Sequence, residues 1–262
     1  MDFTLSGDQL ELKQQARAWL ADHFPLDRDW DAQDDRWSDL EALGWLDVAG
    51  AGLGFVEEAL LAEETGYALY PGPYLAHVAG PAVAMGLTLG ADADTPTVDP
   101  TRPVRLPEGG WTSYETPRFR AACAAEALGI AQRALDLGVE HAKTREQFGK
   151  PIGTYQAVSH PLAQTYTDVE LARSLVYWAA WCVAEEDERA ELAAAAAKAF
   201  AAEAAVTACE RSIQVHGGTG FTWEHPLHRF YKRALWLQGF GESPAELRAE
   251  VAELVLGAPV TA

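Results

Sequence analysis

Residues 145–153 have the sequence REQFGKPIG, which places an arginine, a glutamine and a lysine on a glycine-punctuated turn. The chain as a whole is acidic, with 20 lysines and arginines against 39 aspartates and glutamates. Lys143, Arg145 and Lys150 therefore form a local group of cations in an acidic protein. Because positive charges gathered on one turn attract a negative group, we expect this turn to bind a small anion.

The overall charge argues against some classes of binding partner. A formal net charge of -19 at pH 7 would repel nucleic acid and anionic membranes from most of the surface. The opening residues MDFTLSGDQL have no basic segment followed by an apolar one, and no run of eighteen apolar residues occurs. We therefore expect a cytoplasmic protein with neither a nucleic acid nor a membrane as partner.

The elements that must position the turn have helical periodicity. Ser6 and Gln9 have capping-box spacing at the start of a helix that continues to Phe24. Two further helices are predicted over about residues 52–64 and 74–89. We take residues 1–89 as an N-terminal helical domain. Residues 90–117 hold five prolines and a Gly-Gly pair, which predict a linker or a vestigial β segment.

The C-terminal part, residues 118–262, is predicted to be a helical bundle. The periodicity indicates three long helices and then two shorter ones, over about 118–144, 155–185, 190–215, 224–238 and 243–255. The alanine run at 193–197 favours a helix and lets neighbouring helices approach closely. The expected fold is all-α, with an antiparallel four-helix-type bundle and the middle β-domain absent or vestigial.

Two stretches of this C-terminal half together resemble the acyl-CoA dehydrogenase family. They are TREQFGKPIGTYQAVSHPLA, residues 144–163, and IQVHGGTGFTWEHPLHRFYKRA, residues 213–234. They follow, in order and spacing, the family patterns Arg-Glu-x-Phe-Gly-x-x-Ile-x-x-x-Gln and Gln-x-x-Gly-Gly-x-Gly-Phe/Tyr. Residues 40–76 are similar to the opening helical domain of the family, so the resemblance extends over nearly the whole chain.

The resemblance implies a cofactor and a reaction. Members of the family bind FAD and oxidise an acyl thioester at its α and β carbons. A glutamate removes the α proton while hydride passes to flavin N5. The two motifs reach across a dimer interface, to a flavin that is bound mainly by the neighbouring subunit.

The resemblance also assigns cofactor-facing roles to six residues, which are Arg145, Gln147, Phe148, Gln214, Gly217 and Gly218. The planar guanidinium of Arg145 can hold a pyrophosphate through two parallel hydrogen bonds, which a lysine cannot do. The amide of Gln214 can bond the nucleotide, and the glycines let the backbone approach it closely.

The chain departs from the family in its middle part. Family members have a sheet domain between the two helical parts, and six or more strands need at least about 50 residues. Residues 90–117 are too few for such a domain. We therefore expect that this chain does not enclose the reactive end of a flavin by itself.

The catalytic base is the second departure. Most members have the glutamate at the position of Gly241, and others have it on the first long bundle helix, near the position of Phe119. Neither residue can accept a proton. Glu242 lies one place further on and is the catalytic candidate if the loop shifts register. Its other interpretation is a carboxylate near the N-terminus of the following helix.

We expect no metal site. His225 and His228 have i, i+3 spacing, but the sequence shows no third ligand at a matching spacing. The three cysteines, Cys123, Cys182 and Cys209, lie far apart in apolar helical segments, which predicts core packing.

Three hypotheses follow from the sequence. In the first, the chain is a subunit of a heteromeric FAD-dependent acyl-CoA dehydrogenase, and a full-length relative supplies the sheet domain and the base. Its substrate would be an acyl-CoA or a related acyl thioester, with a bulky, steroid-type acyl group as one candidate. In the second, it is a self-sufficient homo-oligomeric flavoprotein with Glu242 as base. In the third, it is a cofactor-free scaffold that binds a partner.

Overall fold

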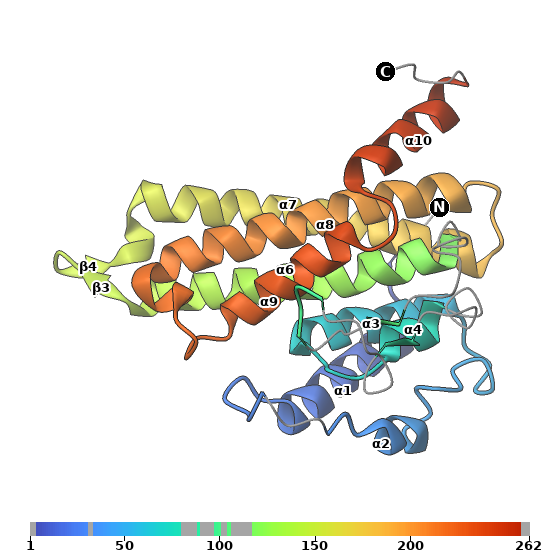
Figure 1. The fold of residues 1–262 in the computed structure, drawn as a ribbon, viewed down its shortest axis with the longest axis horizontal. Helices are drawn as coiled ribbons and strands as arrows, with labels where there is room; N and C mark the ends of the chain where they lie inside the picture. Colours follow the sequence, from blue (N-terminus) through green and yellow to red (C-terminus); the bar gives the residue numbers. More distant parts are fainter. Residues whose placement is uncertain are drawn as a thin grey trace.

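Two groups of helices pack against each other, an N-terminal group and a longer C-terminal bundle (Figure 1). The computed structural model describes residues 4–30, 34–79, 88–89, 97–100, 104–105 and 117–257. One cluster of buried apolar side chains joins the two groups, with Leu20 and Leu61 from the first and Leu128 and Phe230 from the second. The predicted all-α fold class is confirmed.

The N-terminal group consists of α1 (Gly7–His23), α2 (Trp37–Ala42), α3 (Phe55–Ala68) and α4 (Tyr74–Ala79). The capping box predicted for α1 is present, because the backbone N–H of Gln9 donates to Ser6 Oγ at 3.2 Å and that of Ser6 donates to Gln9 Oε1 at 2.9 Å. The helix predicted over 74–89 begins at Tyr74 as expected. Its last two residues were predicted wrongly, since they form a strand, and residues 80–87 lie outside the described part.

The C-terminal bundle consists of α6 (Pro117–Thr144), α7 (Gln156–Ala184), α8 (Ala190–His216), α9 (Leu227–Gly239) and α10 (Pro244–Leu256). Successive helices from α6 to α9 alternate in direction, so α6 and α8 run the same way and end at the same end of the bundle (Figure 1). The long alanine run makes α8 narrow enough to pack against α6 and α7 at once, and four of its five alanines, all except Ala196, are fully buried. The predicted bundle is confirmed.

The two groups cross closely where α3 meets α6. A Cβ atom on Gly66 of α3 would collide with the carbonyl group of Glu126, and one on Gly129 of α6 would collide with that of Glu63. Glycine at both positions therefore lets the two backbones touch. This crossing fixes the N-terminal group on the side of α6 that faces away from α8.

Strand structure in the described residues is limited to two-residue segments. β1 (Thr88–Leu89) pairs antiparallel with β2 (Val104–Arg105), with Thr88 opposite Arg105. Most of the predicted linker, 90–117, lies outside the described residues. In its described part, this segment is attached to the C-terminal bundle through Asp99, which is 2% exposed and forms an ion pair with Arg233 of α9.

By length and composition alone, the segment Ala190–Phe221, which contains α8, is apolar enough to cross a membrane. In this fold, however, 67% of its most apolar window is buried inside the bundle. The apolar surface of α8 is therefore used for packing against its neighbouring helices.

Candidate functional site

The cationic turn, residues 145–153, contains a β-hairpin that projects from the end of the bundle (Figure 1). β3 (Glu146–Gln147) pairs with β4 (Lys150–Pro151), and the two residues between the strands, Phe148 and Gly149, have φ values of 53° and 79°. Two positive φ values are typical of the tight turn that suits the twist of a hairpin. Sequence analysis predicted a turn here but not the two strands.

The side chains of the hairpin face outward. Phe148 is 92% exposed, although its left-handed backbone costs on the order of 1 kcal/mol in a residue other than glycine. The guanidinium of Arg145 makes no hydrogen bond or ion pair with any residue that the structure describes. Gln147 is also exposed, and its amide donates only to the neighbouring carbonyl of Glu146, at 2.9 Å. These groups are available to a molecule outside this chain.

The second motif lies where α8 ends. Gln214 is exposed on the last turn, and the short 3-10 helix η2 (Gly217–Phe221) follows. Gly217 needs its positive φ of 61° to end the helix. Gly218 is exposed and has no positive φ, and a Cβ atom there would meet no atom within 4 Å. The described fold gives no reason for a glycine at 218, whereas close approach by an outside group would.

The structure brings these two motifs to one end of the bundle. The ring of His141, near the end of α6, stacks on the ring of His216, at the end of α8, with the centroids 4.2 Å apart. The ring of His225, in the loop before α9, packs against the ring of His216, with the centroids 4.4 Å apart. All six predicted cofactor-facing residues therefore belong to this end, and their roles toward a cofactor stay predictions.

The three histidines form a cluster that sequence analysis missed. Burial and the neighbouring histidines lower the pKa of His225 from 6.5 to about 4, and burial lowers the pKa values of His141 and His216 as well. Arg145 contributes to the lowered pKa of His141 through its charge. The cluster is thus held in its uncharged form at neutral pH. The residues come from three separate segments, so no spacing in the sequence could have revealed it.

Acidification should destabilise the fold through this cluster. The unfolded chain binds a proton at a histidine near pH 6.5, whereas folded His225 binds one only near pH 4. The contribution of His225 to the free energy of unfolding is therefore fully present above about pH 6.5 and is lost as the pH drops toward 4. We expect the melting temperature to fall across this window, and His225→Gln to flatten that fall.

The matched control for this pH series is His160→Gln, because His160 lies exposed on α7. Thermal unfolding of both variants should be followed across the same pH range. Equal slopes in the His160 and His225 variants would show that the cluster does not cause the acid sensitivity.

Glu242, the catalytic candidate, lies at the opposite end of the bundle. Its Oε1 accepts a hydrogen bond from Arg120 at 2.8 Å, near the start of α6, and its Oε2 forms an ion pair with Lys198 at 3.1 Å. Arg120 and Arg145 are separated by 25 positions, which corresponds to about 37 Å along a helix. The site of Glu242 and the hairpin therefore cannot act on the same atoms from within one chain.

These contacts favour the structural interpretation of Glu242. Burial alone would raise the pKa of Glu242, but the charge of Lys198 and the hydrogen bond from Arg120 lower it below its ordinary value. A general base works best with a pKa near the operating pH, so this change makes Glu242 a weaker base. Arg120 also holds Glu250 of α10 at 2.6 Å, so the network attaches the last helix to the bundle.

Changing Glu242 to Gln should lower stability without stopping turnover. We expect a loss of about 2–3 kcal/mol, because the buried Arg120 and Lys198 lose their carboxylate. Urea unfolding measures this loss, and Glu203→Gln, in an exposed pair with Arg248, should cost less than about 1 kcal/mol. A hundredfold loss of turnover in a flavin-containing assembly, with stability unchanged, would instead favour Glu242 as the base.

The two positions that match the base, Phe119 and Gly241, lie beside packed aromatic rings. Phe119 is fully buried, and its ring lies 5.5 Å from that of Phe240, the residue before Gly241. The ring of Trp236 stacks on that of Phe240, with the centroids 4.1 Å apart. The carboxylate that follows Gly241 directly is that of the ion-paired Glu242.

The family of this chain follows from its similarity to known proteins. Residues 110–251, more than half of the chain, match the family model for the C-terminal domain of acyl-CoA dehydrogenases. The chain is 44% identical over 124 residues to the acyl-CoA dehydrogenase IpdE2 of Mycobacterium tuberculosis, a match that covers 47% of this chain and 37% of that protein. It is 40% identical over 135 residues to the probable acyl-CoA dehydrogenase YngJ of Bacillus subtilis, covering 52% of this chain and 35% of that protein.

These matches span about a third of the length of each curated relative. Solved structures agree in fold over nearly the whole chain. The Tcur3481–Tcur3483 steroid ACAD, solved as a variant, gives a TM-score of 0.81 at 24% identity and covers 97% of this chain and 99% of that one. The ChsE4–ChsE5 complex of Mycobacterium tuberculosis gives 0.78 at 21% identity, covering 99% and 100%. From its motifs, its fold and the match of its C-terminal half, this chain belongs to the acyl-CoA dehydrogenase family.

Proposed function

We propose that this chain is a subunit of an FAD-dependent acyl-CoA dehydrogenase and completes a flavin site that a full-length partner houses. The proposal rests on one observation. The six cofactor-facing residues, from Arg145 to Gly218, lie at a bundle end and can be reached from outside, whereas the two positions matching the base are Gly241 and Phe119, which cannot accept a proton. A chain arranged in this way can serve a flavin that it does not itself enclose.

The residues present fit the adenosine-pyrophosphate part of FAD. The guanidinium of Arg145, which has no partner among the described residues, can bind a pyrophosphate through two parallel hydrogen bonds. The amide of Gln214 is exposed for the nucleotide, and the space beside Gly218 is open to it. Phe148, on the tip of the hairpin, can cover a flat ring. FAD would supply hydride acceptance when bound, and this chain would bind and orient it.

Exposed aromatic side chains support a partner at the same end. Besides Phe148, Phe221 is 74% exposed and Trp223 is 73% exposed, and both follow the glycine motif directly. Large aromatic residues are frequent anchors of protein interfaces and are seldom left in water as a group. Two structural neighbours, Tcur3481–Tcur3483 and ChsE4–ChsE5, are named as pairs of chains, which supports a heteromer over a homo-oligomer.

The partner would supply the carboxylate that removes the α proton. Glu242, ion-paired with Arg120 and Lys198, would hold α10 in place in this chain. The neighbour named as a steroid ACAD suggests a steroid-type acyl-CoA as the substrate class to test first. The cytoplasmic location and the absence of a membrane or nucleic-acid partner stay predictions.

The test is acyl-CoA-dependent bleaching of the flavin. The chain should be co-expressed with a full-length family member from the same source, and the purified complex should be mixed without oxygen with steroid side-chain and straight-chain acyl-CoAs. Loss of the visible flavin band, with formation of the α,β-unsaturated thioester, is the expected result. A stable complex that contains flavin but reduces it with no acyl thioester would contradict the proposed reaction.

A further inference from the structure

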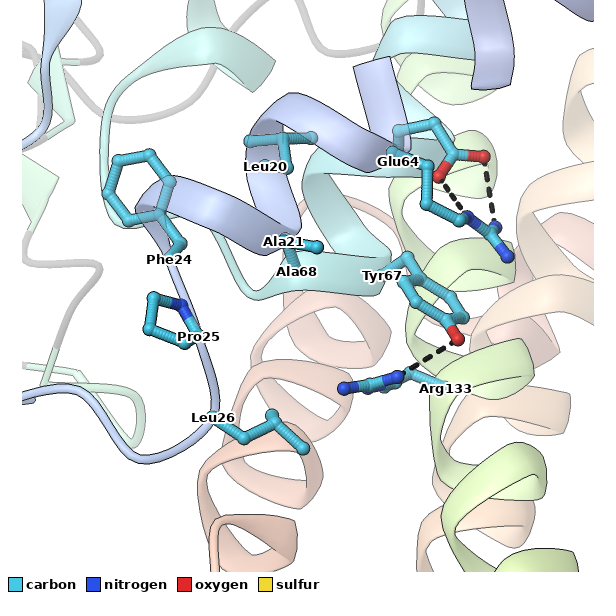
Figure 2. A pocket seen from close by; sticks show the side chains of 10 residues that line it. Leu20, Ala21, Phe24, Pro25, Leu26, Glu64, Tyr67, Ala68 and Arg133 are labelled. Carbon is cyan, nitrogen blue, oxygen red and sulfur yellow. Dashed lines mark hydrogen bonds and ion pairs between the residues drawn. The ribbon is translucent and has the colours of Figure 1, made fainter. Parts of the chain in front are cut away.

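A cavity of about 230 Å³ lies between α1, α3 and α6, on the side of the molecule where the N-terminal helices meet the bundle (Figure 2). One wall is apolar and comes from the end of α1 and the segment after it, with Leu20, Phe24, Pro25 and Leu26. The opposite wall is polar and carries Tyr67 of α3 and Arg133 of α6. Figure 2 shows these two walls facing each other across the space.

Two arginines reach this cavity, and only one of them is neutralised. Arg17 forms two hydrogen bonds with the buried carboxylate of Glu64, at 2.6 and 3.0 Å. Arg133 has no ion pair with any residue in the described parts of the chain. Its Nη1 donates to the hydroxyl of Tyr67 at 3.0 Å, and that hydroxyl donates to Asp136 at 2.9 Å. The carboxylate of Asp136 is thus linked to Arg133 through the hydroxyl of Tyr67.

Arg133 also has a donor without an acceptor. Its Nε is buried and has no hydrogen-bond partner among the residues that the structure describes. Buried donors are nearly always paired, so this guanidinium is under-satisfied by the described residues. Its one hydrogen bond to them comes from Nη1, and an anion in the cavity would supply an acceptor for the same group. The guanidinium groups of Arg17 and Arg133 both lie over the ring of Tyr67, at 3.7 and 4.8 Å from its centroid, which holds the polar wall in place.

We propose that this cavity binds a small monocarboxylate, with its head group on Arg133 and its hydrocarbon body against Leu20, Phe24 and Leu26. A cavity of 150 Å³ holds one benzene molecule, so 230 Å³ holds about nine non-hydrogen atoms. A coenzyme A thioester is far too large for it. Because Glu64 already compensates Arg17, the charged residues that line the cavity leave one net positive charge, on Arg133, which favours a ligand with a single negative charge over a dianion such as a phosphate monoester.

The site is separate from the flavin-facing end and from Glu242. Arg133 lies 12 positions before Arg145 and 13 after Arg120, so it is about 18–20 Å from either along α6. The inference therefore does not depend on the proposed function, and a ligand here would not compete with a flavin or an acyl thioester.

The test is a calorimetric titration of the full chain with hexanoate and with hexanamide, which has the same shape without the charge. We expect hexanoate to bind with a dissociation constant of roughly a millimolar, as suits a ligand of this size, and hexanamide to bind at least tenfold more weakly. Arg133→Gln should weaken hexanoate binding at least tenfold. Ala21→Phe, on the exposed mouth of the cavity, should abolish it by filling the space.

The matched control is Arg248→Gln, which removes an exposed arginine on α10 and should leave hexanoate binding unchanged. Circular dichroism melting of each variant should establish that it is folded before titration. No binding of hexanoate to the wild-type chain at tens of millimolar would overturn the proposal. Equal binding of hexanoate and hexanamide, or equal losses in Arg133→Gln and Arg248→Gln, would overturn the assigned role of Arg133.

Discussion

Replacing Arg145 with alanine should lower the affinity of the proposed heteromeric complex for FAD by about 10- to 100-fold. The estimate corresponds to the loss of a charge-assisted pair of hydrogen bonds to a pyrophosphate, worth about 1.5–3 kcal/mol. Arg145 has no partner in the described part of its own chain, so its removal should leave the fold intact. The measurement is the flavin content of the purified complex as a function of added FAD.

Two variants make this experiment specific. Lys143→Ala removes an exposed positive charge two positions away and should change flavin affinity by less than a factor of about three, since a surface charge acts weakly through water. Arg145→Lys keeps the charge but not the planar fork, and should recover only part of the affinity. If Lys143→Ala and Arg145→Ala have the same effect, Arg145 contributes only general charge.

Replacing Arg233 with methionine should destabilise the fold by about 3–5 kcal/mol, the largest effect on stability that we expect. Arg233 is fully buried on α9, and its guanidinium forms ion pairs with Asp99 and, at 2.6 Å, with Glu126 of α6. Methionine fills a similar volume but removes the ion pairs that Arg233 makes with the two buried carboxylates. The free energy of unfolding in urea measures the loss.

The control is Arg248→Met, which breaks an exposed pair with Glu203 and should cost less than about 1 kcal/mol. A triple variant that adds Asp99→Asn and Glu126→Gln to Arg233→Met should recover much of the lost stability, because no buried charge is then left unpaired. A cost below about 1 kcal/mol for Arg233→Met would mean that the ion pairs of Arg233 with Asp99 and Glu126 do not stabilise the attachment of residues 97–100 to the bundle.

Local sequence signals were enough to predict most of the helices. The capping box at Ser6 and the long periodic segments place α1, α6, α7 and α8 within a few residues of their observed ends. These signals were reliable because each depends on neighbours within about one helical turn. The short helix α2, Trp37–Ala42, was missed because it has only six residues and no side-chain cap at its N-terminus.

The environment of the candidate site depended on contacts between distant residues, which no local pattern contains. Glu242 looked like an acid on a loop, and only the fold shows that Arg120, 122 positions earlier, and Lys198 hold it. The histidine cluster likewise combines His141, His216 and His225 from different segments. The hairpin was predicted as a turn, since two-residue strands are too short to produce an alternating pattern.

The most direct test of the central claim is the visible absorption spectrum of three preparations. These are this chain purified alone, a full-length family member purified alone, and the two purified as a complex. If this chain completes a site in its partner, it should be colourless alone, and the complex should hold more flavin than the full-length member does. Flavin bands in the chain purified alone, at about one flavin per chain, would contradict the claim and show that the chain houses its own cofactor.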